Sequence, residues 1–89
     1  MNESTPYKLI WLPRAEKEVK SLPSEEARKV TDAVGMLAKN PRPNGCKKLQ
    51  GRRNQWRIKV GNDRAIYEVR DAILLVLVVK IGHRKDVYG

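Results

Sequence analysis

The chain has too few cysteines and histidines to build a disulfide or a metal centre. Its single cysteine, Cys46, has no partner for an internal disulfide, so nothing in the sequence requires an oxidising compartment. Cys46 and the only histidine, His83, cannot supply the four ligands of a structural zinc ion. One histidine also excludes a mechanism in which two imidazoles serve as acid and base. We therefore expect neither a metal nor a cofactor.

Targeting and membrane segments are missing as well. The longest apolar run covers residues 72–79 and is far shorter than the roughly 20 residues that cross a bilayer. The N-terminus lacks the basic, apolar and small-residue regions of a signal peptide. With 89 residues, of which 40% are hydrophobic, the chain has room for one domain, residues 1–89, with a modest core. We expect a cytoplasmic protein that does not contact membranes.

Positive charge, in contrast, is abundant and unevenly placed. The sequence has 19 Lys and Arg against 10 Asp and Glu, a formal net charge of +9. Most of that excess lies in residues 47–89. A basic half on a small globular chain indicates a polyanionic partner, most often nucleic acid, which it binds through its phosphates. The alternative is that the charge only keeps a small protein soluble.

The first half has the pattern of a strand followed by two helices. Residues 7–12 are apolar and β-prone, and a proline follows them. Helical spacing of apolar residues then predicts two helices, whose apolar stripes cover residues 15–22 and 27–38. Ser24 is expected to cap the second helix, and the proline-rich segment 40–45 is expected to end it.

From Gln55 onward the apolar period changes from 3.6 to 2. Three strands are predicted, over residues 56–60, 64–69 and 73–81, with tight turns between them. The last of these is apolar on both faces, as a central strand is. The order is therefore β-α-α-β-β-β, which predicts an α+β fold with two antiparallel helices packed on one face of a small, mainly antiparallel sheet.

The alternation in the first of these strands concentrates charge on one face. If Trp56 and Ile58 face the helices, Arg57 and Lys59 project together from the opposite face, about 6–7 Å apart. That spacing is close to the distance between successive phosphates of a nucleic acid. The hairpin is expected to bring Arg64 beside them. An ordinary solvated strand face would show the same pattern, so the charges alone leave both interpretations open.

An ordered set of short motifs makes the chain similar to a known family. It resembles the RelE/ParE superfamily of bacterial toxins from toxin–antitoxin pairs, and most closely the RelE (messenger-RNA interferase) branch. The resemblance covers about residues 7–88. The motifs that carry it are YKLIW at 7–11, NPRP at 40–43, KKLQG at 47–51, WRIKVG at 56–61, RAIYEV at 64–69, IGHR at 81–84 and VY at 87–88.

The resemblance implies a ribosome-dependent endoribonuclease that inhibits translation. Such enzymes cut mRNA in the A site of the 30S ribosomal subunit without a metal. The ribose 2′-OH attacks the adjacent phosphate and leaves a 2′,3′-cyclic phosphate and a 5′-OH. This reaction needs a base, cations for the crowded phosphorane and an acid for the leaving oxygen. The positions that match the family's catalytic residues are Arg57, Lys59, Arg64, Arg84 and Tyr88.

Roles for these residues follow from their acid–base chemistry. Crowding among the arginines should lower the pKa of Lys59 from its usual value near 10.4, so we expect Lys59 to be the general base, supported by Arg57. Arg64 and Arg84 would hold the phosphate through bidentate hydrogen bonds. His83 is a candidate acid, because an unperturbed imidazole titrates near pH 6.5. Tyr88 would stack on or orient the base next to the cut.

Further basic residues and a protein partner complete the expectation. Lys47, Lys48, Arg52 and Arg53 are candidate RNA-binding residues that contact phosphates. The family implies a cognate RelB-like antitoxin that folds on binding, and any DNA contact would be indirect, through that antitoxin. Two alternatives remain: a ParE-like DNA gyrase inhibitor on the same fold, and a non-catalytic RNA-binding module.

Overall fold

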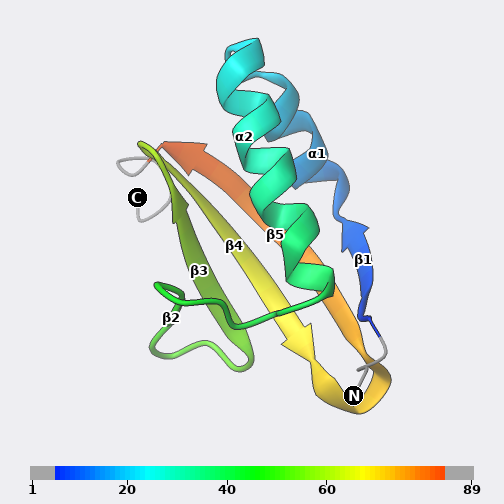
Figure 1. Ribbon diagram of the computed structural model, residues 1–89. Coiled ribbons are helices and arrows are strands. Elements are labelled where there is room, and N and C mark those ends of the chain that lie inside the picture. The colour runs from blue at the N-terminus through cyan, green and yellow to red at the C-terminus, as the bar shows by residue number, and fades with distance from the viewer. Residues whose placement is uncertain (1–5, 84–89) are drawn as a thin grey trace.

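Two helices cover one face of a five-stranded sheet in the part of the chain that this computed structural model describes, residues 6–83 (Figure 1). The expected α+β fold is therefore confirmed. The elements are β1 (Lys8–Trp11), α1 (Pro13–Lys20), α2 (Ser24–Gly35), β2 (Lys47–Lys48), β3 (Gln55–Val60), β4 (Asp63–Arg70) and β5 (Leu75–His83), with 3-10 turns at Met36–Ala38 and Asp71–Ile73.

The helices begin at prolines or next to them. Pro13 ends β1 and occupies the first turn of α1, where its missing N–H costs nothing and its fixed φ suits the helix. In α2 the expected cap at Ser24 is wrong by one residue. The carbonyl of Pro23 already accepts the first helical hydrogen bond, from the N–H of Ala27 at 2.8 Å, so Pro23 takes the cap position and Ser24 is helical.

The sheet has the strand order β1-β5-β4-β3-β2. β1 is an edge strand that pairs in parallel with β5, and the other pairs are antiparallel. The two-residue strand β2 at the opposite edge was not predicted, because two lysines give no periodic signal. Both edge strands, β1 and β2, are short, so little unpaired backbone is available for pairing with the sheet of another molecule.

The two connections within the β3–β4–β5 meander differ in kind. Gly61 and Asn62 form a two-residue hairpin turn, and Gly61 adopts a φ of +62°, which a glycine tolerates without strain. The β4–β5 connection is longer than the tight turn that the sequence predicted. A 3-10 turn at Asp71–Ile73 and a left-handed Leu74, with a φ of +51°, delay the start of β5 to Leu75.

The hydrophobic core lies between the helices and the sheet. Tyr67 is fully buried in it, and Trp11 and Trp56 pack against it. Its buried members are Ala15, Val19, Val30, Val34, Leu37, Ile58, Ala65, Tyr67, Val69, Val76, Val78 and Ile81. Neither helix of residues 6–83 has the length and apolar character needed to span a bilayer.

Candidate nucleic-acid interface

The sheet face opposite the helices carries the predicted cations of the hairpin. Ile58 on β3 and Ala65 on β4 belong to the core, so their strand neighbours project from the other face. Lys59 lies directly opposite Arg64 in the β3–β4 ladder. Directly opposite side chains on one face of a sheet have Cβ atoms about 4.5–5.5 Å apart. The register therefore brings Lys59 and Arg64 together, with Arg57 two residues away on the same strand.

These cations differ strongly in exposure. Lys59 is exposed and Arg57 is half-buried, whereas Arg64 is only 6% exposed. The guanidinium of Arg64 donates one long hydrogen bond, from Nη1 to the carbonyl oxygen of Asp63 at 3.5 Å. Within residues 6–83 its Nε is buried without a hydrogen-bond partner and no carboxylate forms a salt bridge with it. A desolvated guanidinium without a counter-ion is suited to binding an anion bidentately.

Two further lysines extend this surface, and the sequence pattern did not place either of them on this face of the sheet. Lys47 on β2 lies opposite Arg57, and Lys80 on β5 lies opposite Ile66. We call Lys47, Arg57, Lys59, Arg64 and Lys80 the basic face. Simple alternation along β5 would have placed Lys80 with Val76 and Val78 in the core. A register shift between Ile66 and Tyr67 inserts one extra residue into β5 and turns Lys80 to the basic face.

His83 does not join the basic face. It lies opposite Asp63 in the β4–β5 ladder, and Asp63 shares the helix-facing side of β4 with Ala65. A neighbouring group on that side is Glu26 of α2. A hydrogen bond with Asp63 raises the pKa of the Glu26 carboxyl group, and the positive charge of His83 lowers it. Arg84 and Tyr88, the other two predicted catalytic residues, lie outside the described residues.

The four candidate RNA-binding residues do not form one cluster. Lys47 and Lys48 are successive strand residues and point to opposite faces. Lys47 belongs to the basic face, whereas the Lys48 ammonium lies 5.9 Å from the centre of the Trp56 ring on the helix side. Arg52 and Arg53 are exposed in the loop before β3, where they line an open cavity of about 600 Å³ with Lys48.

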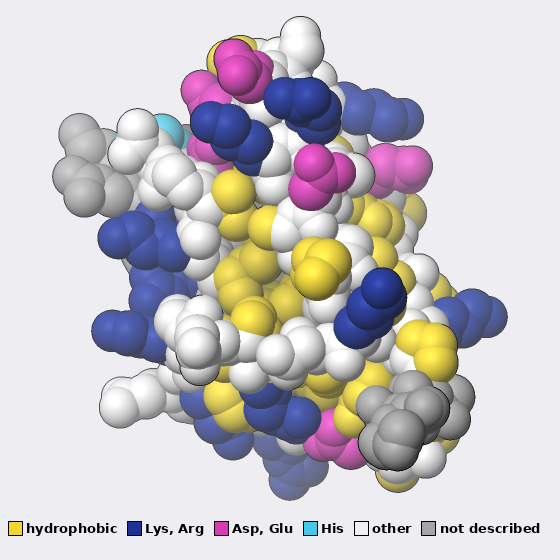
Figure 2. Space-filling view, in the orientation of Figure 1, with side chains coloured by type: hydrophobic (Ala, Val, Ile, Leu, Met, Phe, Trp, Pro, Cys, Tyr) yellow, Lys and Arg dark blue, Asp and Glu magenta, His cyan; other side chains and the backbone are white. Residues whose placement is uncertain are grey.

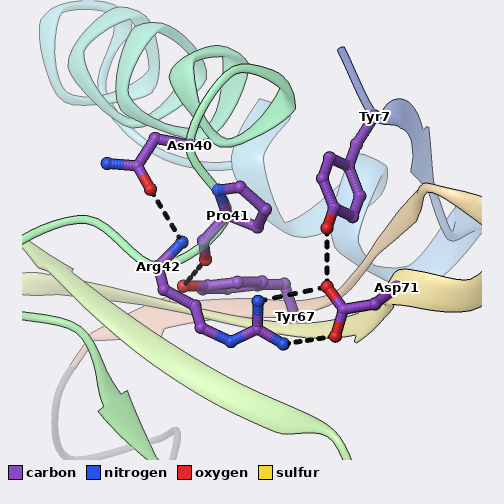
Figure 3. Close-up of polar contacts among 6 residues, drawn as sticks. All are labelled: Tyr7, Asn40, Pro41, Arg42, Tyr67 and Asp71. Carbon is purple, nitrogen blue, oxygen red and sulfur yellow. Dashed lines mark hydrogen bonds and ion pairs between the residues drawn. The ribbon is translucent and has the colours of Figure 1, made fainter. Parts of the chain in front are cut away.

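A polar clamp on the helix side holds the segment before β2 against the sheet (Figure 3). Asp71 accepts hydrogen bonds from the Tyr7 hydroxyl at 2.6 Å and from two Arg42 nitrogens at 3.1 and 2.7 Å. The hydrogen bonds from Arg42 and then Tyr7 lower the pKa of the Asp71 carboxyl group to about 2. The Arg42 guanidinium also lies 4.9 Å from the centre of the Trp56 ring, a cation–π contact.

A second contact fixes the same segment. The Tyr67 hydroxyl, which projects from the core, donates a hydrogen bond to the carbonyl oxygen of Pro41 at 2.7 Å (Figure 3). Burial raises the pKa of Tyr67, so this hydroxyl stays protonated. Sequence reasoning assigned no role to Tyr7, Arg42 or Asp71, because their contacts join segments that are distant in the chain. Together these contacts place β2, and with it Lys47, beside β3.

The helix side of the molecule shows the same charge asymmetry as the sequence. In Figure 2, Lys and Arg side chains gather along the margin formed by β2 and β3, whereas acidic and basic side chains alternate over the upper ends of the helices. Hydrophobic side chains lie between these two regions. Among residues 6–83, no three His, Cys, Asp or Glu side chains are grouped so that they could hold a metal ion.

Comparison with known proteins identifies the family. Residues 9–88 match a family model described as the ParE toxin of the type II toxin–antitoxin system parDE. No sequence among the curated proteins matches the chain.

Solved structures of RelE toxins have the same fold. The toxin–antitoxin complex RelBE2 from Mycobacterium tuberculosis matches with a TM-score of 0.74 and 25% identity, over 89% of this chain and 99% of that one. The isolated RelE toxin of E. coli matches with a TM-score of 0.76 and 29% identity, over 92% and 90% of the two chains. An archaeal RelE–RelB complex from Pyrococcus horikoshii OT3 has a TM-score of 0.79 at 23% identity, over 91% and 98%. With the family model, these matches establish that the chain belongs to the RelE/ParE superfamily of toxins from type II toxin–antitoxin systems.

Proposed function

We propose that this toxin is a ribosome-dependent endoribonuclease that cuts mRNA in the A site. The observation that carries the proposal is the pairing of Arg64, a buried guanidinium without a carboxylate partner in residues 6–83, with the exposed amine of Lys59. The two groups offer an anion site next to a proton acceptor, which RNA cleavage by the ribose 2′-OH requires.

The proposed reaction assigns one task to each cation. Lys59, in its neutral form, accepts the proton of the 2′-OH, and the 2′-oxygen attacks the adjacent phosphorus. Arg57 and Arg64 offset the negative charge of the phosphorane, and Arg84 is proposed to hold the same phosphate. The bond from phosphorus to the 5′-oxygen then breaks, and that oxygen takes up a proton from water. Tyr88 is proposed to orient the neighbouring base. We give His83 no part in the proton transfer, since it lies opposite Asp63 on the helix side.

Cleavage of ribosome-bound mRNA tests the proposal. Purified toxin is added to ribosomes programmed with a defined messenger, and primer extension locates the cuts. We expect discrete A-site cuts that leave a 2′,3′-cyclic phosphate. Lys59→Ala and Arg64→Ala should each lower the single-turnover rate by about 100-fold or more. Arg28→Ala removes an equal charge from an exposed position on α2 and serves as the control. Intact messenger with the unsubstituted toxin would refute the nuclease.

A gyrase inhibitor is the second candidate, because the matching family model is described as a ParE toxin. Such a toxin would have the same fold but would inhibit DNA gyrase. Incubation of the toxin with gyrase and supercoiled DNA separates the two functions. Trapped DNA breaks together with uncut messenger would favour the gyrase inhibitor, and the reverse result would favour the nuclease. A protein that binds ribosomes but gives neither product would be a non-catalytic RNA-binding module.

We propose that a cognate antitoxin of the RelB type neutralises the toxin. Several of the structures with the same fold are described as RelB–RelE complexes. This chain offers the unpaired edge of β1 and an open groove of about 290 Å³ lined by Trp11, Val19 and Ala27. A partner with apolar and acidic side chains would suit that groove and the net charge of +9. Co-expression with a short neighbouring reading frame should relieve growth arrest and yield a stable complex. Contact with DNA would then be made by the antitoxin, and a ribosomal target would place the toxin in the cytoplasm.

A further inference from the structure

The cations of the basic face lie in two rows that run across the strands. β2, β3, β4 and β5 are neighbours in the sheet (Figure 1), and side chains directly opposite each other in a ladder point to the same face. The first row is Lys59 on β3 and Arg64 on β4. Lys80 has no role in the proposed reaction and belongs to the second row, which crosses all four strands as Lys47, Arg57, Ile66 and Lys80.

Arg57 and Lys80 flank Ile66 on the two neighbouring strands. Each is directly opposite Ile66, so their Cα atoms are two strand spacings apart, about 9–10 Å. Ile66 is 8% exposed although it lies on the face opposite the core. Both flanking side chains are half-buried, as is expected where aliphatic stems cover an apolar neighbour and the charged ends stay at the surface. An apolar floor with a cation on each side is a site that a phosphate group can enter from solvent and contact from both sides.

The distance between the two rows suits successive phosphates of one RNA strand. Arg57 and Lys59 are two residues apart on β3, which separates the rows by about 6–7 Å. That is close to the distance between neighbouring phosphates along a nucleic acid. Because the first row is the proposed site of the scissile phosphate, the second row lies where the next phosphate of the same strand would be.

The row beyond the second one carries a carboxylate in place of a cation. Glu68 on β4 lies opposite Gln55 on β3 and Leu77 on β5. Its carboxylate forms a salt bridge with Arg70. Neither a neutral ion pair nor an apolar side chain attracts a third phosphate. Within residues 6–83 the basic face is therefore two rows deep, which limits it to two successive phosphates.

We propose that Arg57 and Lys80 form a second phosphate site over Ile66, and that this site binds the messenger phosphate next to the scissile one. The inference rests on the proposed nuclease function, because it takes the first row as the site of cleavage. Lys80 contributes a positive charge to binding and takes no part in the proton transfers. It therefore raises the affinity of the toxin for programmed ribosomes and leaves the rate of the chemical step unchanged.

An uncharged linkage in the messenger tests the site directly. Ribosomes are programmed with messengers that carry 2′-deoxyribose throughout the A-site codon, so that no 2′-OH is available for cleavage there. In two of these messengers, a methylphosphonate replaces the phosphate on one side or the other of the proposed cut. Binding is measured for the unsubstituted toxin, Lys80→Gln and Lys80→Arg. Lys8→Gln is the matched control, because Lys8 is an exposed lysine on the same face of the sheet, at the far edge in β1.

Loss of the charge on either partner of this contact should have related effects. We expect one of the two methylphosphonates to weaken binding of the unsubstituted toxin about fivefold or more, and Lys80→Gln to weaken binding to the all-phosphate messenger about fivefold. On the messenger with that methylphosphonate, Lys80→Gln should bind as the unsubstituted toxin does, because the charge that Lys80 contacts is already gone. Lys80→Arg and Lys8→Gln should bind every messenger as the unsubstituted toxin does. On an ordinary messenger, Lys80→Gln should cleave at an unchanged maximal rate.

Each other outcome contradicts a specific part of the inference. If Lys80→Gln weakens binding equally on charged and uncharged messengers, Lys80 contacts ribosomal RNA instead, and the site is overturned. If Lys80→Gln binds every messenger as tightly as the unsubstituted toxin, the site is overturned as well. A lower maximal cleavage rate at unchanged binding would place Lys80 in the chemical step and contradict its assignment to binding. If the unsubstituted toxin cuts no ordinary messenger, the nuclease proposal fails, while the binding measurements, which need no cleavage, still decide whether Lys80 contacts a messenger phosphate.

Discussion

Replacing Arg64 by methionine should stabilise the protein while removing its proposed activity. The reason is that Arg64 is 6% exposed, yet its guanidinium has one hydrogen bond of 3.5 Å and no carboxylate partner among residues 6–83. Burial without compensation disfavours the folded state. Methionine has a similar length, no charge and a flexible side chain that fills irregular space.

The expected change in the free energy of unfolding follows from the polar atoms of Arg64 that are buried without partners among residues 6–83. A buried donor without a partner, such as Nε of Arg64, costs about 1–3 kcal/mol, and replacing buried charges by apolar side chains has stabilised other proteins by about 1–4 kcal/mol. We expect Arg64→Met to raise the free energy of unfolding by about 2 kcal/mol. For a domain of this size, each kcal/mol raises the melting temperature by about 4–8 °C.

Urea unfolding at neutral pH measures the change, with single-turnover cleavage measured in parallel. The control is Lys59→Met, which removes an equal charge from an exposed position of the same face and should change the free energy of unfolding by less than about 0.5 kcal/mol. Both variants should lose cleavage. A variant Arg64→Met that unfolds at lower urea than the unsubstituted protein would show that the guanidinium has a stabilising partner, and the reasoning about an unpaired anion site would be wrong.

Three further predictions concern the contacts that hold the fold. Tyr67→Phe should lower the free energy of unfolding by about 1 kcal/mol in urea, because the carbonyl of Pro41 loses its donor. The hydrogen bonds from Arg42 and Tyr7 lower the pKa of Asp71 to about 2, so ionised Asp71 stabilises the fold at pH values above the ordinary pKa of an aspartate, and this stabilisation is lost as the pH falls through about 2. In Asp71→Asn, the free energy of unfolding measured against pH should therefore fall less steeply on the acidic side. Glu18 accepts a hydrogen bond from the backbone N–H of Ile81 at 2.8 Å, so Glu18→Ala should cost about 1–3 kcal/mol and speed hydrogen exchange at that amide, whereas Glu18→Gln should preserve most of its protection.

Local patterns were sufficient to predict the layers of this fold. The change of apolar period at Gln55 marks the boundary between helices and meander, and Gly61 marks the hairpin turn that the structure has. Alternation on β3 correctly separated Ile58 in the core from Arg57 on the other face. These features depend on neighbours within a few residues, which a sequence displays directly.

The features that the sequence did not display depend on long-range contacts. The position of Lys80 follows from a single extra residue in β5, and nothing in an apolar run reveals where that residue sits. The contacts of Asp71 join it to Tyr7 and Arg42, which lie 64 and 29 residues away in the chain. His83 was a candidate acid in the sequence analysis, but it lies opposite Asp63 on the helix side of the sheet, and this position depends on the register between β4 and β5.

Register links the stability of this protein to its proposed chemistry. Along β4 the residues that face the helices, such as Ala65 and Tyr67, alternate with Arg64 and Ile66 on the opposite face of the sheet. A slip of one residue would bring Arg64 into the core and expose Tyr67, so the apolar core and the anion site are specified by the same pairing. The hairpin turn at Gly61 fixes that pairing on one side of β4, and the register shift in β5 accommodates it on the other. The core therefore selects the register in which Arg64 is buried, although its Nε has no hydrogen-bond partner among residues 6–83, because a slip of one residue would take Ala65 and Tyr67 out of the apolar layer.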